Sequence, residues 1–354
     1  MTTLIVQIPC LNEEATLATV LDSIPRRIDG IDDIQVVVID DGSTDRTAAI
    51  AAERGAHVIR HVRTMGLARS FRDGVDYALH VGADIVVNTD GDNQYPQGSI
   101  PELVRPILDG TAEIVVGDRQ TDQVPHFSPF KKIMQRWGSR VVNAAAQTEI
   151  PDAASGFRAY SRASLLRLNV ITPFSYCMET IIQAGSRRLP IVSVPVVTNP
   201  KTRESRLFRN IWEHMFKSGM AVTRSYLMFR PYLVLTVLGV VFGLAALIPF
   251  ARFGVLWLTE DGVGHIQSLI FGTSMFVGCL LSFALLVIAD LLRTNRLLLE
   301  ETLERTKQMQ YADPSRYPRL WQRARRGPVL PVQRGADGRP PVVEGTDWPR
   351  REAI

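Results

Sequence analysis

The residues best suited to chemistry lie in the segment Asp90-Gly91-Asp92-Asn93-Gln94, which follows an apolar run over residues 83–88. Two carboxylates and a side-chain amide oxygen at the end of a buried strand supply hard oxygen ligands. Such a set suits Mg2+ or Mn2+, with the ion also holding a diphosphate. The alternative is an acidic turn without a ligand, because Asp, Gly and Asn are ordinary turn residues.

The elements that must position this segment are predicted by the first third of the chain. Apolar runs predict short buried strands over residues 4–8, 34–39, 57–60 and 83–88. Helical patterns alternate with them over residues 12–24, 44–54, 66–81 and 98–108. This alternation predicts a parallel sheet with helices on both faces. Ligands bind at the carboxyl ends of such strands, where Pro9, Asp40 and Asp90 all lie.

Two uncharged apolar runs later in the chain, Leu233 to Ala251 and Ile266 to Ala289, are each long enough to cross a membrane as a helix. Buried helices of a soluble protein are the alternative. Basic residues flank the pair on both outer sides, whereas the connector over 252–265 carries one Arg against two acidic residues. The positive-inside rule therefore predicts that both ends are cytoplasmic.

Small residues recur four positions apart in these two runs, where two helices could approach closely: Gly239, Gly243, Ser274, Gly278 and Ser282. Before the first run, residues 210–229 carry broad apolar stripes beside Lys217 and Arg224. We interpret this stretch as helices at the headgroup level, with packing against the preceding domain as the alternative. From Asp313 onward the chain is rich in Arg and Pro. This composition predicts a disordered tail that binds anionic lipid headgroups.

Composition narrows the class of protein. The 354 residues are 46% hydrophobic, and the net charge is only +4, with the basic residues crowded into the second half. This asymmetry favours a membrane surface or a phosphorylated substrate over nucleic acid. The N-terminus shows no signal-peptide pattern, and the three cysteines show no metal or disulfide spacing, which is typical of a reducing compartment.

Four motifs in this order resemble family 2 glycosyltransferases of the GT-A fold: Ile8-Pro9-Cys10-Leu11-Asn12-Glu13-Glu14, Val38-Ile39-Asp40-Asp41-Gly42-Ser43-Thr44-Asp45, Gly66-Leu67-Ala68-Arg69 and Asp90-Gly91-Asp92. Ser155-Gly156-Phe157-Arg158 and the terminal hairpin narrow the resemblance to the polyprenyl-phosphate, dolichol-phosphate mannose synthase-like branch. The resemblance covers roughly residues 3 to 230. It implies an α/β GT-A (Rossmann-like) nucleotide-sugar domain followed by a two-helix transmembrane hairpin.

The expected organisation has four parts: a cytoplasmic glycosyltransferase domain over 1–208, juxtamembrane amphipathic helices over 209–230, a transmembrane hairpin over 231–292, and a largely disordered basic tail over 293–354. The resemblance implies a multi-pass protein of the cell membrane with its catalytic domain and both termini in the cytoplasm. Its expected partners are a nucleotide-sugar donor, a polyprenyl or dolichyl phosphate acceptor and membrane lipids. Relatives with two-span hairpins often assemble, so a homo-oligomer is also expected, and nucleic acid is not.

The resemblance also implies roles residue by residue. One set would line the donor nucleotide: Pro9, Leu11, Glu13, Asp40, Asp90 and Gly91. A second set would hold Mg2+ or Mn2+ on the donor diphosphate: Asp90, Asp92 and Gln94. For Asp40 the alternative is a turn in which Ser43 or Thr44 caps the next helix. For Glu13 the alternative is a favourable charge in the first turn of a helix.

The phosphate and acceptor side draws on later residues: Arg119, Lys132, Arg136, Arg203 and Arg206 would bind phosphate. Lys132 and Arg136 share one face of a helix expected over 130–146, for which a solvated charged face is the alternative. Arg203 stands where relatives have Gly, so Arg206 is the stronger candidate. Asp92, Arg119 and Asp152 would be catalytic, although Asp152 could instead form a buried structural pair with Arg158.

We therefore expect inverting transfer of a sugar from a UDP- or GDP-linked donor to a polyprenyl or dolichyl monophosphate. The acceptor oxygen is already ionised near neutral pH, so the reaction needs no strong general base. A processive polysaccharide synthase is an alternative, although Gln135-Arg136-Trp137 lacks the spacing of the synthase motif. A sugar nucleotidyltransferase would want a Gly-rich, Lys-bearing loop after the first strand. A non-catalytic membrane scaffold with the same fold is the remaining alternative.

Overall fold

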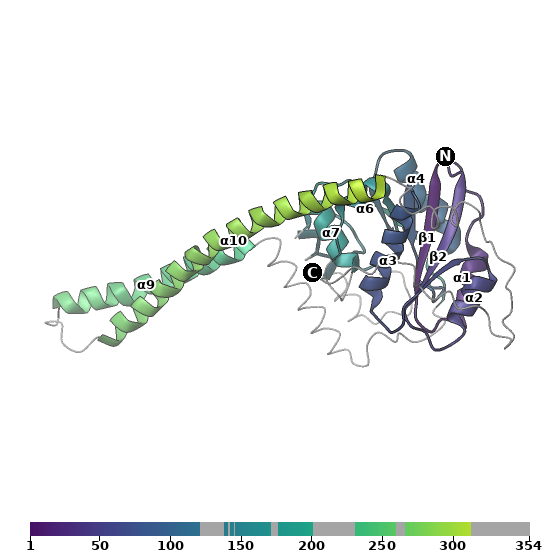
Figure 1. Ribbon diagram of the computed structural model, residues 1–354. Coiled ribbons are helices and arrows are strands. Elements are labelled where there is room, and N and C mark those ends of the chain that lie inside the picture. Colours follow the sequence, from purple (N-terminus) through teal and green to yellow (C-terminus); the bar gives the residue numbers. More distant parts are fainter. Residues whose placement is uncertain are drawn as a thin grey trace. The chain divides into compact units, whose positions relative to one another are not determined.

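The computed structural model describes residues 1–120, 138–140, 142–144, 146–170, 176–200, 231–259 and 266–312 (Figure 1). The chain forms two compact units. The first comprises Met1–Val222 with Thr306–Ile354, and the second comprises Thr223–Arg305.

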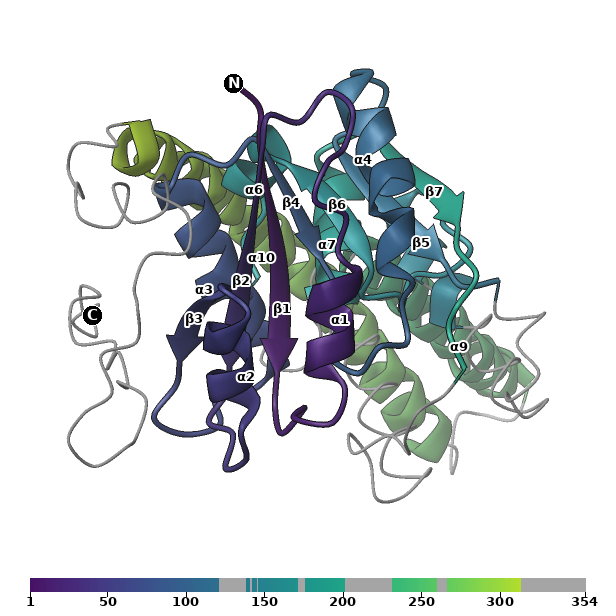
Figure 2. The ribbon, with the colours of Figure 1, turned by 90° about the vertical axis from the view of Figure 1, so that its right-hand side faces the viewer.

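A seven-stranded sheet in the order β3-β2-β1-β4-β6-β5-β7 forms the centre of the first unit (Figure 2). The strands are β1 (Thr3–Cys10), β2 (Asp33–Asp40), β3 (His57–Arg60), β4 (Ile85–Asn88), β5 (Ile114–Asp118), β6 (Arg158–Ser161) and β7 (Ile191–Pro195). The pairs among β3, β2, β1 and β4 are parallel, as predicted. β6, which lies beyond the strands that the sequence predicts, runs antiparallel to both of its neighbours. An antiparallel strand needs no crossover helix, so strand and helix alternation does not reveal it.

Helices cover both faces of this sheet. They are α1 (Leu17–Ser23), α2 (Thr47–Glu53), α3 (Leu67–His80), the 3-10 turn η1 (Gln97–Ser99), α4 (Ile100–Leu108), α6 (Arg162–Arg167) and α7 (Tyr176–Ser186). Alternate residues of β1, including Leu4, Val6 and Ile8, share one buried cluster with residues of α1, α2 and α4. The opposite face of β1 meets α3, because a Cβ at Gly74 would lie 2.4 Å from Gln7 Oε1. Burial on both faces explains the nearly continuous apolar runs of these strands.

The first two helices begin later than the sequence predicts. Asn12 has a φ of 56° and its side chain accepts a hydrogen bond from the Thr44 N–H, so the chain turns here and α1 starts only at Leu17. Neither Ser43 nor Thr44 caps α2, whose N-cap is Arg46. The Ser43 hydroxyl instead accepts a hydrogen bond from Asn12 N at 2.9 Å. The side chains of Asn12 and Ser43 thus connect the loop after β1 to the loop after β2, and they do not cap α2.

The second unit contains α9 (Pro231–Thr259) and the larger part of α10 (Ile266–Ala312). Both helices are long and apolar enough to cross a membrane, with mean hydropathies of 2.6 and 2.5 in their most apolar windows. Only 17% and 6% of those windows are buried by protein. Core helices of a soluble protein would be mostly buried, so the exposed apolar surface favours the predicted membrane spans.

Small residues bring α9 and α10 into contact, as their spacing predicts. A Cβ at Gly239 would lie 3.2 Å from the Phe283 ring, and one at Gly243 would lie 3.3 Å from Cys279 Sγ. Gly278 similarly faces Phe242. Ser274 is an exception, since it is exposed and donates a hydrogen bond to Ile270 O within its own helix.

The final residues of α10, from Thr306 to Ala312, belong to the first unit. Tyr311 is buried there, and its hydroxyl donates a hydrogen bond to Asp76 Oδ1 on α3 at 3.0 Å. Lys307 Nζ donates to Leu168 O at 2.7 Å. Residues 293–312 of the expected basic tail are helical, whereas residues 313–354 of that tail lie outside the described residues.

Candidate functional site

The predicted site residues meet at one edge of the sheet because their strands are parallel and in register. Cys10 at the end of β1 pairs with Asp40 at the end of β2, and Gln7 pairs with Asn88 at the end of β4. Figure 2 shows the arrowheads of β1 and β3 pointing to the same edge. The loops that follow these strands start together, which is where open α/β sheets bind ligands.

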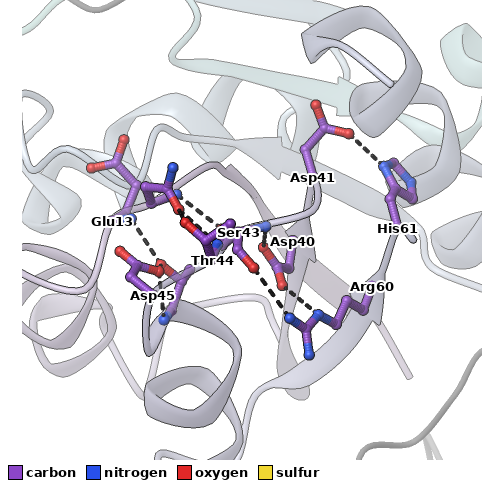
Figure 3. A network of polar contacts seen from close by, with 10 residues as sticks. Glu13, Asp40, Asp41, Ser43, Thr44, Asp45, Arg60 and His61 are labelled. Atoms are coloured by element: carbon purple, nitrogen blue, oxygen red, sulfur yellow. Dashed lines mark hydrogen bonds and ion pairs between the residues drawn. The ribbon is translucent and has the colours of Figure 1, made fainter. Parts of the chain in front are cut away.

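Asp40 lies fully buried at this edge with its two oxygens in different environments. Oδ1 accepts a hydrogen bond from Ser43 N at 2.9 Å, which closes a local turn (Figure 3). Oδ2 lies 3.2 Å from Arg60 Nε in an ion pair, but it has no hydrogen-bond donor among the described residues. Arg60 also donates from Nη2 to Ser43 O at 3.1 Å. Asp40 therefore organises the turn and retains one acceptor oxygen.

Glu13 belongs to the loop between β1 and α1. Its N–H donates to Thr47 Oγ1 at 2.8 Å, and its carboxylate accepts from Thr16 Oγ1 at 3.3 Å. Because α1 begins at Leu17, Glu13 precedes the helix, and the alternative role in the first helical turn is wrong. Of the other residues predicted to line a nucleotide, Pro9 is buried within β1 and Leu11 is exposed.

Gly91 permits the Asp90 segment to lie directly against the end of β1. A Cβ at Gly91 would lie 2.7 Å from Cys10 Sγ and 3.2 Å from Glu13 Cγ, closer than side chains normally approach. Thr16 Oγ1 donates to Gly91 O at 2.7 Å and fixes the segment from the other side. Thr16 was not identified from the sequence, since a single Thr before a helix carries no specific signal.

The Asp90 carboxylate is half-buried, and no hydrogen bond from the described residues reaches it. Burial raises its pKa to about 7, with the charges of Asp92 and Glu13 adding to this effect and Arg119 opposing it. Asp92 Oδ1 accepts a hydrogen bond from Gln94 N at 3.1 Å. The segment thus brings two carboxylates close together at this edge of the sheet.

These carboxylates fit a divalent cation that is shared with a diphosphate. Across the described parts of the chain, no group of three or more His, Cys, Asp or Glu residues is placed to hold a metal alone. Mg2+ commonly binds through one or two carboxylates and completes its shell with substrate phosphate and water. Asp90 and Asp92, together with Gln94, fit that arrangement, and a cation there would lower the pKa of Asp90.

Asp152 forms its ion pair with Arg119, not with Arg158. Arg119 Nε lies 2.6 Å from Asp152 Oδ2, and Nη2 lies 2.9 Å from Oδ1. The buried Arg158 guanidinium instead donates to the backbone oxygens of Ser155, Ala153 and Cys177. The alternative pairing of Asp152 with Arg158 is therefore wrong, because backbone carbonyls satisfy Arg158.

A buried polar chain that includes Gly156, the neighbour of the Asp90 carboxylate, was not identified from the sequence. Gln7 donates to Asn88, which donates in turn to Gly156 O at 2.9 Å and to the Tyr176 hydroxyl at 2.8 Å. The Tyr95 hydroxyl accepts a hydrogen bond from Gly156 N at 3.0 Å. The available signal was the presence of Gln7 and Asn88 within strands that are otherwise apolar.

The remaining predicted phosphate ligands, Lys132, Arg136, Arg203 and Arg206, lie outside the described residues. The amphipathic stretch over 209–230 lies outside them as well. The site geometry therefore rests on the ends of β1, β2, β4 and β5 and on the segment that enters β6.

Comparison with known proteins gives consistent matches. A model of the family described as "Glycosyl transferase family 2" matches residues 5–168. An uncharacterized glycosyltransferase of Mycobacterium tuberculosis is 32% identical over 202 residues, covering 56% of this chain and 85% of that protein. A dolichyl-phosphate hexose transferase of Haloferax volcanii is 28% identical over 214 residues, covering 60% of this chain and 88% of that protein.

A low-salt glycan biosynthesis hexosyltransferase of Haloferax volcanii is 28% identical over 245 residues, covering 67% of this chain and only 58% of that protein. Among solved structures, glucosyl-3-phosphoglycerate synthase from Mycobacterium tuberculosis in complex with Mn2+, UDP and phosphoglyceric acid superposes with a TM-score of 0.50. It is 26% identical, and the match covers 64% of this chain and 78% of that one.

Proposed function

Because the chain belongs to glycosyl transferase family 2, we propose that it transfers a hexose from a nucleotide sugar to a polyprenyl or dolichyl monophosphate. Its mixed sheet resembles that of GT-A glycosyltransferases and is followed by two apolar helices, so the expected fold class is confirmed. The observation that carries the proposal is the pair of half-buried carboxylates, Asp90 and Asp92, at the sheet edge that also holds Asp40.

The donor side of the proposal assigns the nucleotide to the ends of β1 and β2. Asp40 Oδ2 is a buried acceptor that lacks a hydrogen-bond donor in the described structure, which suits an N–H group of a base. Asp90 and Asp92, with Gln94, would hold Mg2+ or Mn2+, which would neutralise the departing diphosphate. The Mn2+ and UDP named for the glucosyl-3-phosphoglycerate synthase structure support this assignment.

The acceptor side follows from the two apolar helices and from relatives named for dolichyl phosphate. A phosphate monoester oxygen is ionised near neutral pH, so attack on the anomeric carbon needs orientation more than a general base. One displacement would invert the anomeric configuration. Arg119 carries the positive charge near Asp90 and would favour the approach of an anionic acceptor, while Asp152 holds its guanidinium in place.

The distribution of basic residues supports a membrane protein with the catalytic unit and both ends of the chain in the cytoplasm. The soluble nucleotide sugar would then reach the catalytic unit from the cytoplasm. The acceptor lipid and the surrounding membrane lipids would be its partners. We also propose that the chain forms a homo-oligomer.

The test is transfer from a panel of radiolabelled UDP- and GDP-sugars to a short polyprenyl monophosphate, using the purified full chain with Mn2+ or Mg2+. Asp92→Ala is the inactive variant, and Asp109→Ala, which removes an exposed carboxylate at the end of α4, is the matched control. We expect metal-dependent label in the lipid phase with wild type and Asp109→Ala only.

Two other outcomes would contradict the proposal. Label in a long water-soluble polymer would indicate a processive polysaccharide synthase. The absence of turnover and of nucleotide binding, with every donor in the panel, would indicate a scaffold that keeps the fold.

A further inference from the structure

His61, the residue after β3, lies between two carboxylates. Its Nδ1 is 2.6 Å from Asp41 Oδ1, and its Nε2 is 3.0 Å from Asp73 Oδ2 on α3. The imidazole is only 10% exposed. A neutral imidazole can donate from one nitrogen only, whereas an imidazolium donates from both. The geometry therefore selects the charged form of His61.

Asp41 connects His61 to the loop over residues 61–66. Its Oδ1 also accepts from Met65 N, and its Oδ2 accepts from Gly66 N, each at 2.8 Å. Gly66 has a φ of 95° and is the N-cap of α3. One carboxylate thus holds both ends of this loop, and Figure 3 shows Asp41 and His61 beside Asp40.

The same loop packs on the turn that follows β2. Gly42 has a φ of 79°, and a Cβ there would lie 2.9 Å from both Arg63 C and Thr64 N. The loop backbone is therefore in direct contact with the turn formed by Asp40 and Ser43. A shift of the loop over 61–66 must therefore disturb the turn formed by Asp40 and Ser43, where we propose that the donor nucleotide binds.

The charges around His61 balance only while it is protonated. It faces Asp41 from the end of β2 and Asp73 from α3, and Arg69 Nε lies 2.8 Å from the same Asp73 oxygen. Asp40 and Arg60 form a separate ion pair nearby. Loss of the His61 proton would leave two carboxylates against one cation, next to a site for an anionic donor. Burial lowers the pKa of His61, but hydrogen bonds to Asp41 and Asp73 outweigh burial and raise that pKa to about 9.

We propose that His61 is a positioning residue for the donor: as an imidazolium it holds the loop over 61–66 against the Asp40 turn in the arrangement that binds the nucleotide diphosphate. The inference rests on the proposed function, since it assumes that a nucleotide binds at this edge. His61 acts through Asp41 and the loop rather than by contact with the reacting atoms. Its loss should weaken donor binding and change the chemical step little.

The experiment measures the affinity of the full chain for UDP and for GDP, each with Mg2+, by titration calorimetry from about pH 7 to just above the pKa of His61. His61→Gln removes the charge, and Asp73→Asn removes one of the two carboxylates that favour it. His80→Gln is the matched control, because His80 is a second buried histidine of the same unit, and its Nδ1 contacts Asp76 O at the far end of α3.

We expect wild type to bind one of the two nucleotides and to lose affinity as the pH rises through about 9. His61→Gln should bind about tenfold more weakly near neutral pH, in line with the loss of a charge-assisted hydrogen bond, and should lose less affinity than wild type as the pH rises. Asp73→Asn should move the loss of affinity to lower pH. His80→Gln should follow wild type. In the transfer assay, His61→Gln should raise the donor KM while kcat changes little.

A pH-independent affinity in wild type, or equal affinities of wild type and His61→Gln, would overturn the proposal while leaving the proposed function intact. If His61→Gln does not fold, the wild-type profile and the shift in Asp73→Asn decide the question. If wild type binds neither nucleotide at any pH, the proposed function fails and this inference fails with it. The two failures are therefore distinguishable.

Discussion

Arg119 and Asp152 form a two-point ion pair, with Nε 2.6 Å from Oδ2 and Nη2 2.9 Å from Oδ1. The pair joins the residue after β5 to the segment that leads into β6, and both side chains are largely withdrawn from water. Two residues with separate expected roles are therefore one structural unit. A change in either partner alters the charge and the position of the other.

Removal of one partner should destabilise the protein more than removal of both. Asp152→Asn removes the counter-charge that is hydrogen-bonded to the buried Arg119 guanidinium, for which we expect a loss of about 3–5 kcal/mol in stability. The double variant Arg119→Met with Asp152→Asn should recover part of that loss. Urea unfolding of wild type, Arg119→Met, Asp152→Asn and the double variant measures the coupling free energy between the two residues.

The control for this prediction is Asp109→Asn, which breaks the exposed pair between Arg105 and Asp109. Exposed pairs contribute at most about 1 kcal/mol, so this variant should unfold close to wild type. Equal losses in Asp152→Asn and Asp109→Asn would show that the Arg119 pair is not buried as described.

Gly91 and Gly98 provide a matched comparison of two substitutions by Ala. At Gly91 a Cβ would lie 2.7 Å from Cys10 Sγ, whereas at Gly98 it would meet nothing within 4 Å. Gly91→Ala should displace the Asp90 segment and lower kcat/KM by about tenfold or more, since small displacements of binding groups reduce catalysis strongly. Gly98→Ala should retain wild-type kinetics. Similar kinetics in the two variants would contradict the close packing of Gly91 on β1.

The parallel half of the sheet could be predicted from the sequence because each of its strands is a short apolar run. Burial on both faces produces such runs, and carboxylates after Ile39 and Thr89 then mark the functional edge. The antiparallel strand β6 could not be predicted in this way. Its direction depends on the path taken by the chain between β5 and β6, about which local composition says nothing.

The polar contacts of the site were largely unpredictable for a related reason. Asp152 pairs with Arg119, 33 positions away, although Arg158 is much closer in sequence. Likewise, nothing local connects His61 with Asp41. Partner choice for a buried charge depends on which strands are neighbours, and that information is tertiary. By contrast, the contact of α9 with α10 follows from a spacing of small residues that the sequence shows directly.

His61 should couple stability to pH. Its pKa is about 9 in the folded protein and 6.5 for the ordinary residue. A raised folded pKa stabilises the fold fully below the ordinary value, and this contribution disappears as the pH rises through the folded value. We expect the stability of wild type to exceed that of His61→Gln by ~2–3 kcal/mol at about pH 6, with the difference shrinking as the pH rises from about 6.5 to about 9. Urea unfolding curves of the two proteins from about pH 6 to above the folded pKa measure this difference in stability. A difference that stays constant with pH would contradict the raised pKa of His61.

Removal of divalent cations should weaken binding of the nucleoside diphosphate. Asp90 and Asp92 bring negative charge to the site, so without a cation they should repel a diphosphate. We expect chelation of Mg2+ to reduce affinity for UDP or GDP by about tenfold or more in wild type. In Asp92→Asn the dependence on Mg2+ should be largely lost, and in Asp109→Asn it should persist. Titration calorimetry with and without chelator separates these results.

The close approach of α9 and α10 at Gly243 can be tested by a cross-link. A Cβ at Gly243 would lie 3.3 Å from Cys279 Sγ, so Gly243→Cys places two thiols within disulfide range. At Gly254, also on α9, a Cβ would meet nothing within 4 Å, which makes Gly254→Cys the matched control. The native Cys10 and Cys177 are buried in the first unit and should react slowly with an oxidant.

After mild oxidation in detergent, Gly243→Cys should migrate faster on a denaturing gel than its reduced form, because a disulfide closes the loop between the two helices. Gly254→Cys should not change. Fragment mass spectrometry should assign the bond to residues 243 and 279. Since small residues allow close packing only where the helices touch, equal behaviour of the two variants would contradict the contact at Gly243 and the role of small residues in forming the hairpin.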